Sequence, residues 1–370
     1  MGRVAQYPGA FATHTRDELI RNTREILWPQ IVEALTKPIL DEERSAGIAG
    51  SKGDIRDDVF YGTIDEINEY FKDMNWSDGL PIVPPTFEKV ESFLKYTDLR
   101  WDETVAILPI AHRNTKVWHV AVNAVMAGCK SEYMPILIAL TKGLGDPEFR
   151  RTLASTHAWI PYCWLNGPVA WQLGINCGQG QINEAANVAI GRFMNLALMN
   201  LCGYYVKQDR MGTFGYPMSW CMAEDEEACL RVGWKPYHVR EGFGLDESTI
   251  TLASTLLWGN NMAPSTTDPQ KLMELLAWDI SERSQFALGS GRQFTFRTVL
   301  MTEPVAAILA EKYGSPEALE KDLIDAARNK VQTMPGGGYA TIKIELPENW
   351  DSLMAELGYE PLESYSVLRR

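Results

Sequence analysis

The sequence predicts an α/β or α+β fold, with a single large mixed domain, a buried central helix and an N-terminal helical extension. Segments of strand length that are rich in β-branched and aromatic residues alternate with segments of helical periodicity. The chain has 370 residues, of which 45% are hydrophobic and 22% charged, and this composition is ordinary for a protein with a full core. The buried helix is expected over 184–202, where apolar residues occupy almost every side.

The N-terminal part of the chain differs from the rest. Residues 15–42 place apolar side chains at helical spacing but include Pro29, which predicts a broken amphipathic helix. Residues 43–58 are polar and rich in glycine, which predicts an exposed connection. We therefore expect a helical extension with a loop over 1–58 and one α/β domain over 59–370.

The domain itself is expected to interleave helices and strands. Thr86 has the character of a helix N-cap. Helices are expected after Thr86 and at 63–73, 116–128, 132–144, 184–202, 268–284, 304–313 and 315–329. Strands are expected at 104–110, 156–165, 248–255, 294–302 and 339–346. No short repeat or clear linker divides this region, which favours one domain.

Composition and motifs argue against several classes of protein. A formal net charge of −13 opposes general nucleic-acid binding, which needs clustered lysine and arginine. The sequence has no apolar stretch of about 18 residues and no apolar core of a signal peptide, which predicts a cytoplasmic protein without a membrane span. The six cysteines form no CxxC pair, and Walker, GxGxxG and haem motifs are absent, so we expect neither a metal nor a cofactor.

Cys129 is the cysteine with the best sequence environment for a nucleophile. It follows a break at Gly128 between two expected helices and precedes the second helix, whose expected cap is Ser131. Backbone N–H groups at a helix start, together with the neighbouring Lys130, favour a thiolate. The alternative is that Cys129 is a small buried residue at a tight corner between two helices.

His119 and Asn123 lie four residues apart on the first of these helices and therefore share a face. Either side chain could hydrogen-bond a ligand, and His119 could transfer protons. The alternative for both residues is a structural role, which is the commoner one for a single histidine on a helix.

A glycine-rich segment precedes the expected buried helix. Gly174, Gly178 and Gly180 come just before Asn183, the expected N-cap of that helix. Such a loop can offer backbone N–H groups to a carboxylate, a phosphate or a developing oxyanion. A connection that only has to pack closely would need the same glycines.

The expected buried helix carries polar side chains that need partners. Asn187, Gly191 and Asn195 recur every four residues and form a stripe that faces either a ligand cavity or neighbouring backbone. Arg192 either holds a buried carboxylate or binds an anionic substrate.

Two polar segments outside that helix supply further candidates. Asp78 stands in a turn signal and is either a turn former or an acid/base group. His238 and Arg240 alternate in an expected strand and would share a face, as an acid/base and anion-binding pair or as an edge pair with a carboxylate. The acidic run 224–227 is expected to be a solvated face rather than a metal site.

A set of motifs extends over roughly residues 70–260. They are DGLPIVPPT (78–86), VAVNAVMAGCKSEYMP (120–135), NGP (166–168), LGIN (173–176), AIGR (189–192), AEDEEA (223–228) and WKPYHVREGF (234–243). As a set, these stretches resemble a large bacterial family of uncharacterised proteins that includes UGSC-type proteins, which contain selenocysteine or cysteine. This chain lacks the U/C-G-S-C sequence itself, and the resemblance implies no reaction and no catalytic residue.

We expect a small-molecule enzyme, and the first hypothesis is a cysteine-dependent lyase or hydrolase acting on an anionic or carbonyl-bearing substrate. In it Cys129 is the nucleophile or acid/base group, and His119 or His238 moves protons. The expected substrate-binding residues are Asn123, Asn166, Asn176, Gly178, Asn187, Arg192 and Arg240. A second hypothesis is a lyase or hydratase that uses His238 and Asp78. A third is a non-catalytic subunit, for which twelve tryptophans and fourteen methionines supply apolar material for a homo-oligomeric or partner interface.

Overall fold

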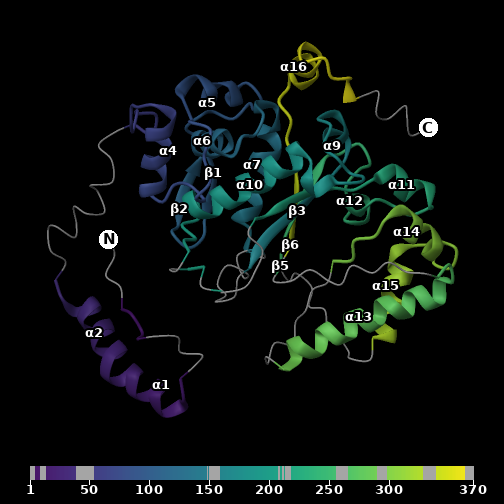
Figure 1. Cartoon of the computed structure of the whole chain (residues 1–370), viewed down its shortest axis with the longest axis horizontal. Coiled ribbons are helices and arrows are strands. Elements are labelled where there is room, and N and C mark those ends of the chain that lie inside the picture. The colour runs from purple at the N-terminus through teal and green to yellow at the C-terminus, as the bar shows by residue number, and fades with distance from the viewer. Residues whose placement is uncertain are drawn as a thin grey trace. The chain divides into compact units, whose positions relative to one another are not determined.

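Two units make up the chain, and they divide between Val59 and Phe60. The computed structural model describes residues 5–8, 14–38, 54–147, 149, 159–206, 209, 210, 212, 218–255, 266–289, 298–327 and 339–362. The first unit contains one described helical segment, over residues 16–36. The second unit contains a two-stranded sheet, a four-stranded sheet and the other described helices (Figure 1).

The described part of the first unit is dominated by one helical segment. Its first helix, α1 (Arg16–Asn22), starts at a capping box formed by Thr15 and Glu18. A π-helical turn (Thr23–Leu27) joins it to α2 (Trp28–Thr36), whose second residue is Pro29. Proline offers no N–H to the carbonyl four residues earlier, and the wider turn just before it accommodates this loss. The helix is therefore continuous where the sequence predicts a break.

Two short amphipathic helices open the second unit. The first, α4 (Ile64–Asp73), starts at a capping box made by Thr63 and Glu66. The second, α5 (Phe87–Leu94), starts at Thr86, whose hydroxyl accepts a hydrogen bond from a backbone N–H of its first turn, as predicted. Each helix buries one apolar face and leaves its polar face exposed.

A small antiparallel sheet follows α5. It consists of β1 (Thr104–Leu108) and β2 (Arg113–Lys116). β2 leads directly into α6 (Val117–Ala127), so the two-stranded sheet fixes the start of that helix.

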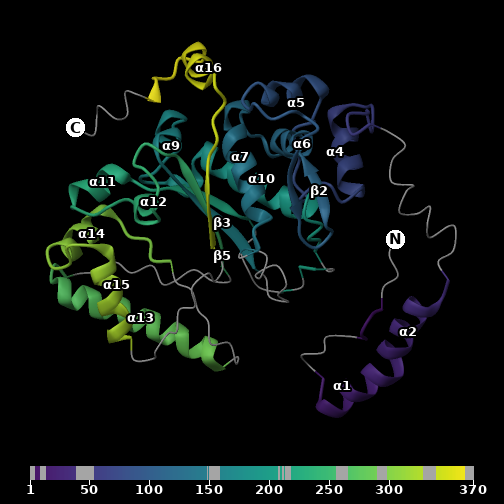
Figure 2. The same ribbon diagram turned by 180° about the vertical axis from the view of Figure 1, so that it is seen from behind.

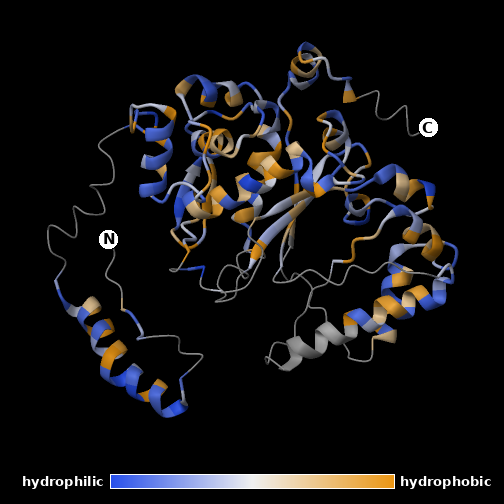
Figure 3. Ribbon diagram, in the orientation of Figure 1, coloured by the Kyte–Doolittle hydropathy of each residue, from blue (hydrophilic) through white to orange (hydrophobic). Residues whose placement is uncertain are grey.

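Three apolar helices form the core of the second unit: α6, α7 (Met134–Leu144) and α10 (Ala185–Asn200). A 3-10 turn (Ser131–Tyr133) leads into α7. Hydrophobic residues concentrate on these three helices (Figure 3). Most residues of α10 are buried, which confirms the prediction of a buried central helix.

The four-stranded sheet has the strand order β4-β3-β5-β6. Its strands are β3 (Ile160–Asn166), β4 (Trp220–Ala223), β5 (Thr249–Thr255) and β6 (Tyr339–Lys343). β3 and β4 are parallel, whereas β5 is antiparallel to both β3 and β6. This is the mixed α/β architecture that the sequence predicts.

The parallel pair depends on a crossover connection. From β3 the chain passes through α9 (Pro168–Gln172), a 3-10 turn (Gln181–Asn183) and α10 before it returns as β4. Parallel strands need a connection of this kind, and it brings their carboxyl ends to the same edge of the sheet. Asn166 ends β3 and Ala223 ends β4 at that edge.

The two faces of the sheet differ in chemistry because successive side chains alternate between faces. One face is apolar and packs against α7 and α10. Its residues include Cys163, Leu165, Cys221, Ile250, Leu252 and Ile342. The opposite face, which we call the polar–aromatic face, carries Tyr162, Trp164, Asn166, Trp220, Met222, Thr249 and Thr251. Figures 1 and 2 show α10 and α12 on opposite sides of the sheet.

The remaining helices lie after β4 in the chain. They are α11 (Glu226–Arg231), α12 (Tyr237–Arg240), α13 (Pro269–Gly289), α14 (Glu303–Ala310), α15 (Pro316–Ala326) and α16 (Trp350–Glu356). Residues of α13, α14 and α15 surround Trp234 in a separate apolar cluster. Among the described helices, none has the length and apolarity that crossing a bilayer requires.

Several expected strands differ from the observed ones. The described part of 294–302, residues 298–302, is not a strand, and residues 238–240 belong to a helical turn. The strands β2 and β4 are not predicted from the sequence. Each has only four residues, and neither shows the alternation of apolar and polar residues that indicates a strand. Parts of the expected elements, such as residues 39–42 and 156–158, lie outside the described residues.

The close approach of α10 to the start of β4 provides a test of this packing. A Cβ atom added to Gly191 would lie 2.4 Å from the carbonyl oxygen of Ser219. We expect Gly191→Ala to lower the free energy of unfolding by at least about 2 kcal/mol, because the clash outweighs the better helix propensity of alanine. Urea denaturation measures the difference.

Gly314→Ala is the matched control, because a Cβ atom at Gly314 would have no atom within 4 Å. We expect its free energy of unfolding to stay within about 0.5 kcal/mol of the wild type. Equal stability of the two variants would contradict the close packing of α10 on β4.

Candidate functional site

The carboxyl ends of β3 and β4 bring a group of polar side chains together. We call Asn166, Glu224, Glu226 and His238 the strand-end cluster. Asn166 is the last residue of β3, and Glu224 directly follows the last residue of β4. Ligands of open α/β sheets commonly bind outside the carboxyl ends of parallel strands.

Glu224 points into the molecule and is held on both oxygens. Its Oε2 accepts hydrogen bonds from Asn166 Nδ2 at 2.5 Å and from the backbone N–H of Tyr237 at 2.8 Å. Its Oε1 accepts a hydrogen bond from the thiol of Cys229 at 3.4 Å. Burial raises the pKa of Glu224 although these hydrogen bonds oppose the rise, and the charge of Glu226 adds to it. A carboxyl group with such a pKa is suited to proton transfer.

Glu226 is buried, with 4% of its surface exposed, whereas Glu224 is half-buried. Its Oε1 accepts hydrogen bonds from the backbone N–H of Gly167 and from Asn166 Nδ2. The expectation of a solvated acidic face is therefore wrong for Glu224 and Glu226. It fails because α11 starts within the run. Asp225 caps this helix, Glu226 faces β3, and of the four residues Glu227 is the exposed one.

Gly167 makes the contact with Glu226 possible. Its φ is +88°, which favours glycine, and a Cβ atom there would lie 2.3 Å from the carbonyl oxygen of Glu247. Only a residue without a side chain can therefore present its N–H to Glu226 at the end of β3.

His238 is the most unusual member of the strand-end cluster. Its side chain is fully buried, and its Nδ1 lies 3.8 Å from Glu226 Oε1. Neither ring nitrogen has a hydrogen-bond partner among the described residues. Buried polar groups in native proteins are almost always satisfied by protein, water or ligand, so these two nitrogens point to a bound molecule.

His238 and Arg240 do not share a strand face as the sequence predicts. They lie in the single helical turn α12, for which Pro236 is the N-cap and which ends before Gly242, whose φ is +96°. The turn directs His238 inward, and Arg240 forms ion pairs with Glu317 and Glu320. Arg240 is thus held by carboxylates of α15.

Two other buried atoms, one in the cluster and one beside it, lack partners among the described residues. They are Asn166 Oδ1 and Thr249 Oγ1. Asn166 and Thr249 are register partners on β3 and β5, so their side chains are neighbours on the polar–aromatic face. The unpartnered atoms of His238, Asn166 and Thr249 therefore gather at one edge of the sheet.

Arg192 and Asp78 form an ion pair. Arg192 Nε and Nη2 each donate to a carboxylate oxygen of Asp78 at 3.0 Å, and Nη2 also donates to the carbonyl oxygen of Pro81 at 2.8 Å. This is the first of the two alternatives for Arg192, in which it holds a carboxylate. Asp78 also accepts a hydrogen bond from the N–H of Leu80, so it stabilises the turn as well.

The polar stripe of α10 faces backbone. Asn187 Nδ2 donates to the carbonyl oxygens of Asn176 and Cys221, and its Oδ1 accepts from the N–H of Asn176. Asn195 Oδ1 accepts from the N–H and the hydroxyl of Ser219. Of the two alternatives for this stripe, the contact with neighbouring backbone is therefore confirmed, and Asn187 and Asn195 anchor the segment around β4.

The glycine-rich loop lies close to the acidic run. Gln181 in this loop accepts a hydrogen bond from the N–H of Ala223 at 2.9 Å. The sequence predicts that the N–H of Gly178 binds the substrate. In the structure this N–H donates a hydrogen bond to Asn176 Oδ1 at 2.7 Å. The expected N-cap at Asn183 is wrong, because Asn183 ends a 3-10 turn and α10 starts after Glu184.

His119 and Asn123 take part in helix packing. His119 Nδ1 accepts a hydrogen bond from the backbone N–H of Lys116 at the start of α6. Burial lowers the pKa of His119, and nearby Lys116 and Arg113 lower it further. Asn123 is buried and joins α6 to α10 by accepting a hydrogen bond from Asn200 Nδ2 at 2.9 Å.

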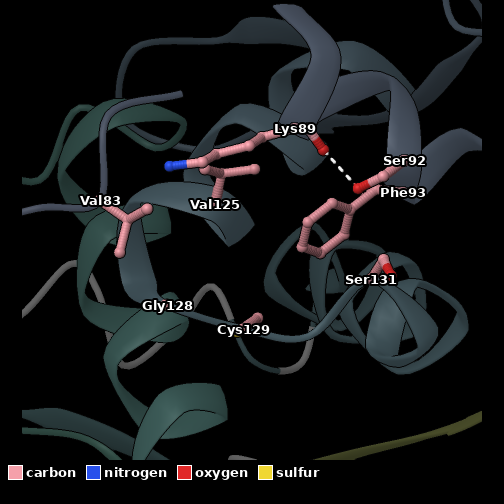
Figure 4. Close-up of a pocket in the computed structure, with 8 residues that line it drawn as sticks. All are labelled: Val83, Lys89, Ser92, Phe93, Val125, Gly128, Cys129 and Ser131. Carbon is pink, nitrogen blue, oxygen red and sulfur yellow. Dashed lines mark hydrogen bonds between the residues drawn. The ribbon is translucent and has the colours of Figure 1, made fainter. Parts of the chain in front are cut away.

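Cys129 lines a pocket of about 260 Å³. Figure 4 shows Cys129 and Gly128 at one end of the pocket and Lys89 and Phe93 of α5 across from them. Gly128, with a φ of +81°, ends α6, and the backbone N–H of Cys129 closes the same helix by donating to Ala124. The expected cap at Ser131 is wrong, because Ser131 lies in the 3-10 turn that precedes α7.

The environment of the Cys129 thiol does not favour a thiolate. The thiol donates a hydrogen bond to the carbonyl oxygen of Ala189 at 3.4 Å. Burial raises the pKa of Cys129, and the neighbouring Cys221 raises it further. The charge of Arg192 lowers this pKa, but by less than burial raises it. The expected effect of the helix start is therefore outweighed by desolvation.

We also searched the described residues for side chains that could bind a metal ion together. The described residues contain no group of three or more histidine, cysteine, aspartate or glutamate side chains placed to hold one. Glu224, Glu226 and Thr249 are not among the site residues that the sequence predicts. Only the motif AEDEEA could have indicated the two glutamates, and this motif does not show that the buried strand β4 ends directly before it.

Cysteine reactivity tests the description of Cys129. We expect iodoacetamide to modify the exposed Cys177 before the half-buried Cys129 in native protein at pH 7, because the raised pKa keeps the Cys129 thiol protonated. Mass spectrometry of the digested protein locates the modified residue. Cys129 should react readily only after unfolding, and its preferential alkylation in native protein would contradict this description.

The raised pKa of Glu224 predicts a pH dependence of stability. The folded state holds the Glu224 proton more tightly than the unfolded state, whose pKa is near the ordinary 4.5. This proton stabilises the folded state at pH values below the pKa of the unfolded state. The stabilisation is lost as the pH rises through the higher pKa that Glu224 has in the folded state. We therefore expect the free energy of unfolding of the wild type, minus that of Glu224→Gln, to fall with increasing pH from about 4.5 upward.

Urea titrations of both proteins across this pH range measure that difference. Glu227→Gln is the control, because Glu227 is exposed in the same acidic run, and its difference from the wild type should stay nearly constant. A difference for Glu224→Gln that rises with pH would show that the folded pKa is lowered instead.

Comparison with known proteins gives no further guidance. No protein-family model, curated protein or solved structure matches this chain. The resemblance to the UGSC-type family therefore stays a prediction, and function has to be inferred from the strand-end cluster and the pocket beside Cys129.

Proposed function

We propose that this protein is a small-molecule enzyme that uses acid–base chemistry at the strand-end cluster, as a lyase or hydratase does. The observation that carries the proposal is His238, whose imidazole is fully buried without a hydrogen-bond partner on either nitrogen among the described residues. Imidazole is the side chain most often used for proton transfer. This proposal modifies the hypothesis of a lyase or hydratase that uses His238 and Asp78. It keeps His238 and assigns the part of Asp78 to Glu224 and Glu226.

The three titratable side chains take different roles. Glu226 is the positioning residue, since its carboxylate lies beside His238 Nδ1 and can orient the ring. His238 Nε2 then faces the substrate as the general base. Glu224, whose pKa is raised by burial, holds a proton more readily than an ordinary glutamate and acts as the general acid.

The proposed reaction is an elimination, in which the substrate loses a proton and a leaving group from neighbouring carbon atoms. His238 Nε2 takes a proton from a carbon atom of the substrate, and the electron pair of that C–H bond forms a carbon–carbon double bond. The bond from the neighbouring carbon to the leaving group breaks, and the leaving group departs with the electron pair and takes up the proton of Glu224. Hydration of a double bond is the reverse sequence with water as the added group.

Glu224 takes the acid/base role that the sequence offered to Asp78, because Asp78 forms an ion pair with Arg192. Both of its carboxylate oxygens accept hydrogen bonds from Arg192, which hold it in place at the turn before Leu80. The partners of Glu224 are an amide, a backbone N–H and a thiol, all uncharged groups. Glu224 is therefore the better donor of a proton.

A cysteine-dependent lyase or hydrolase is the second candidate. It is favoured by one observation, the position of Cys129 in the wall of a pocket. The raised pKa of the thiol weighs against it, because a nucleophilic cysteine normally has a lowered pKa.

Incubation with a mixture of cellular metabolites tests the proposal, with mass spectrometry to find compounds that are consumed. We expect the wild type to consume at least one compound, and Glu224→Gln and His238→Gln to slow that reaction by about 10²- to 10⁴-fold. Glu227→Gln and Cys129→Ser should retain the activity. Circular dichroism and thermal unfolding confirm that each variant is folded.

Other outcomes identify the competing hypotheses. Loss of the reaction in Cys129→Ser, with full activity in His238→Gln, would establish the thiol mechanism instead. A wild type that consumes nothing alone, but that purifies with a second protein and activates it, would establish the non-catalytic subunit.

A further inference from the structure

We propose that the substrate of the strand-end cluster carries a protonated amine. This inference rests on the proposed function, because it names the substrate class of the same site. It replaces the anionic or carbonyl-bearing substrate that the sequence analysis expects. Three properties of the described residues support it: the balance of hydrogen-bond donors and acceptors, the charge, and the aromatic side chains.

The cluster needs hydrogen-bond donors from its ligand. Asn166 Oδ1 is a buried acceptor without a partner among the described residues, and its own amide N–H groups already donate to Glu224 and Glu226. One ring nitrogen of a neutral histidine is also an acceptor. A protonated primary amine carries three N–H donors and no acceptor, so it complements these atoms.

The two arginines that the sequence predicts for binding an anion are already paired. Arg192 forms its ion pair with Asp78, and Arg240 forms ion pairs with two glutamates of α15. Lys343, at the end of β6, is paired with Glu247. An anionic substrate would therefore meet the carboxylate of Glu226 and the carboxyl oxygens of Glu224 without a free cation among these three to offset them.

The glycine-rich loop does not restore an anion site. The pKa of Cys177 in this loop is raised first by burial and then by the charges of Asp225, Glu227 and Glu226. The loop therefore lies in a negative field that extends over the acidic run. Such a field attracts a cationic molecule and repels a carboxylate.

Aromatic side chains adjoin the carboxylates. Tyr237 donates its backbone N–H to Glu224, and its ring meets Trp164 edge to face with the centroids 5.2 Å apart. Trp164 lies two residues before Asn166 and shares its face of β3. Cations are attracted to the faces of such rings, so a carboxylate next to tryptophan and tyrosine suits an ammonium group.

The binding of simple probes tests the inference directly. We would titrate the whole protein with n-butylamine, butyrate and butanol, which share a chain length and differ in charge, and follow binding by calorimetry and by the midpoint of thermal unfolding. For a ligand of this size we expect a dissociation constant on the order of 1 mM for n-butylamine. Butyrate and butanol should bind at least about tenfold more weakly, which is a difference of about 1.4 kcal/mol.

Matched variants separate a specific site from general attraction to an acidic protein. Glu224→Gln and Glu227→Gln each replace one carboxyl group of the acidic run by an amide, but only the first alters the cluster. We expect Glu224→Gln to weaken the binding of n-butylamine about tenfold or more and Glu227→Gln to leave it unchanged. Equal loss in both variants, tighter binding of butyrate, or no response to n-butylamine at about 50 mM would overturn the inference.

The binding experiment does not depend on turnover, so the two proposals can fail separately. If n-butylamine binds through Glu224 but no compound is consumed, the inference stands and the proposed function fails. If a His238-dependent reaction consumes a compound without an amine, the function stands and the inference fails.

Discussion

The contact between α10 and β4 controls the position of everything that surrounds the candidate site. Gly191 lets the helix approach the backbone at Ser219, and Asn187 and Asn195 hydrogen-bond the backbone on either side of that point. These bonds satisfy polar groups that would otherwise be buried without partners, at a cost of about 1–3 kcal/mol each. The contact sets β4 parallel to β3, and the carboxyl ends of both strands therefore meet.

The strand-end cluster follows from this arrangement. Once β3 and β4 end side by side, Asn166 lies next to Glu224 and Glu226, and Gly167 can donate its N–H to Glu226. The cluster holds the buried side chains of Glu226 and His238 and the half-buried side chain of Glu224, and proteins retain such groups chiefly where they are paired or functional. The polar–aromatic face supplies Trp164 and Thr249 beside them, whereas the apolar face of the same sheet secures its packing against α7 and α10.

Local patterns predicted much of the fold, because periodicity and capping depend on neighbours in the sequence. The helix start at Thr86, the buried helix α10 and the strands β3, β5 and β6 were all expected near their observed positions. Residues 238–240 were expected as a strand, since alternation over three residues does not distinguish a strand from one helical turn. The acidic run was expected to be solvated, because its four residues give no sign that β4 ends directly before them.

For the candidate site, the sequence by itself determined which residue types were present and offered two alternatives for most of them. It identified Arg192 as the partner of a carboxylate or an anion, and the stripe on α10 as facing a ligand or backbone. Only the tertiary structure decided between them, by placing Asp78 against Arg192 and Ser219 against Asn195. It alone brought Glu224, Glu226 and His238 together, since the two glutamates contact Asn166, which lies 58 and 60 residues before them in the chain. Burial and pairing are properties of such distant contacts, and so no local pattern could have set the pKa of Glu224 or of Cys129.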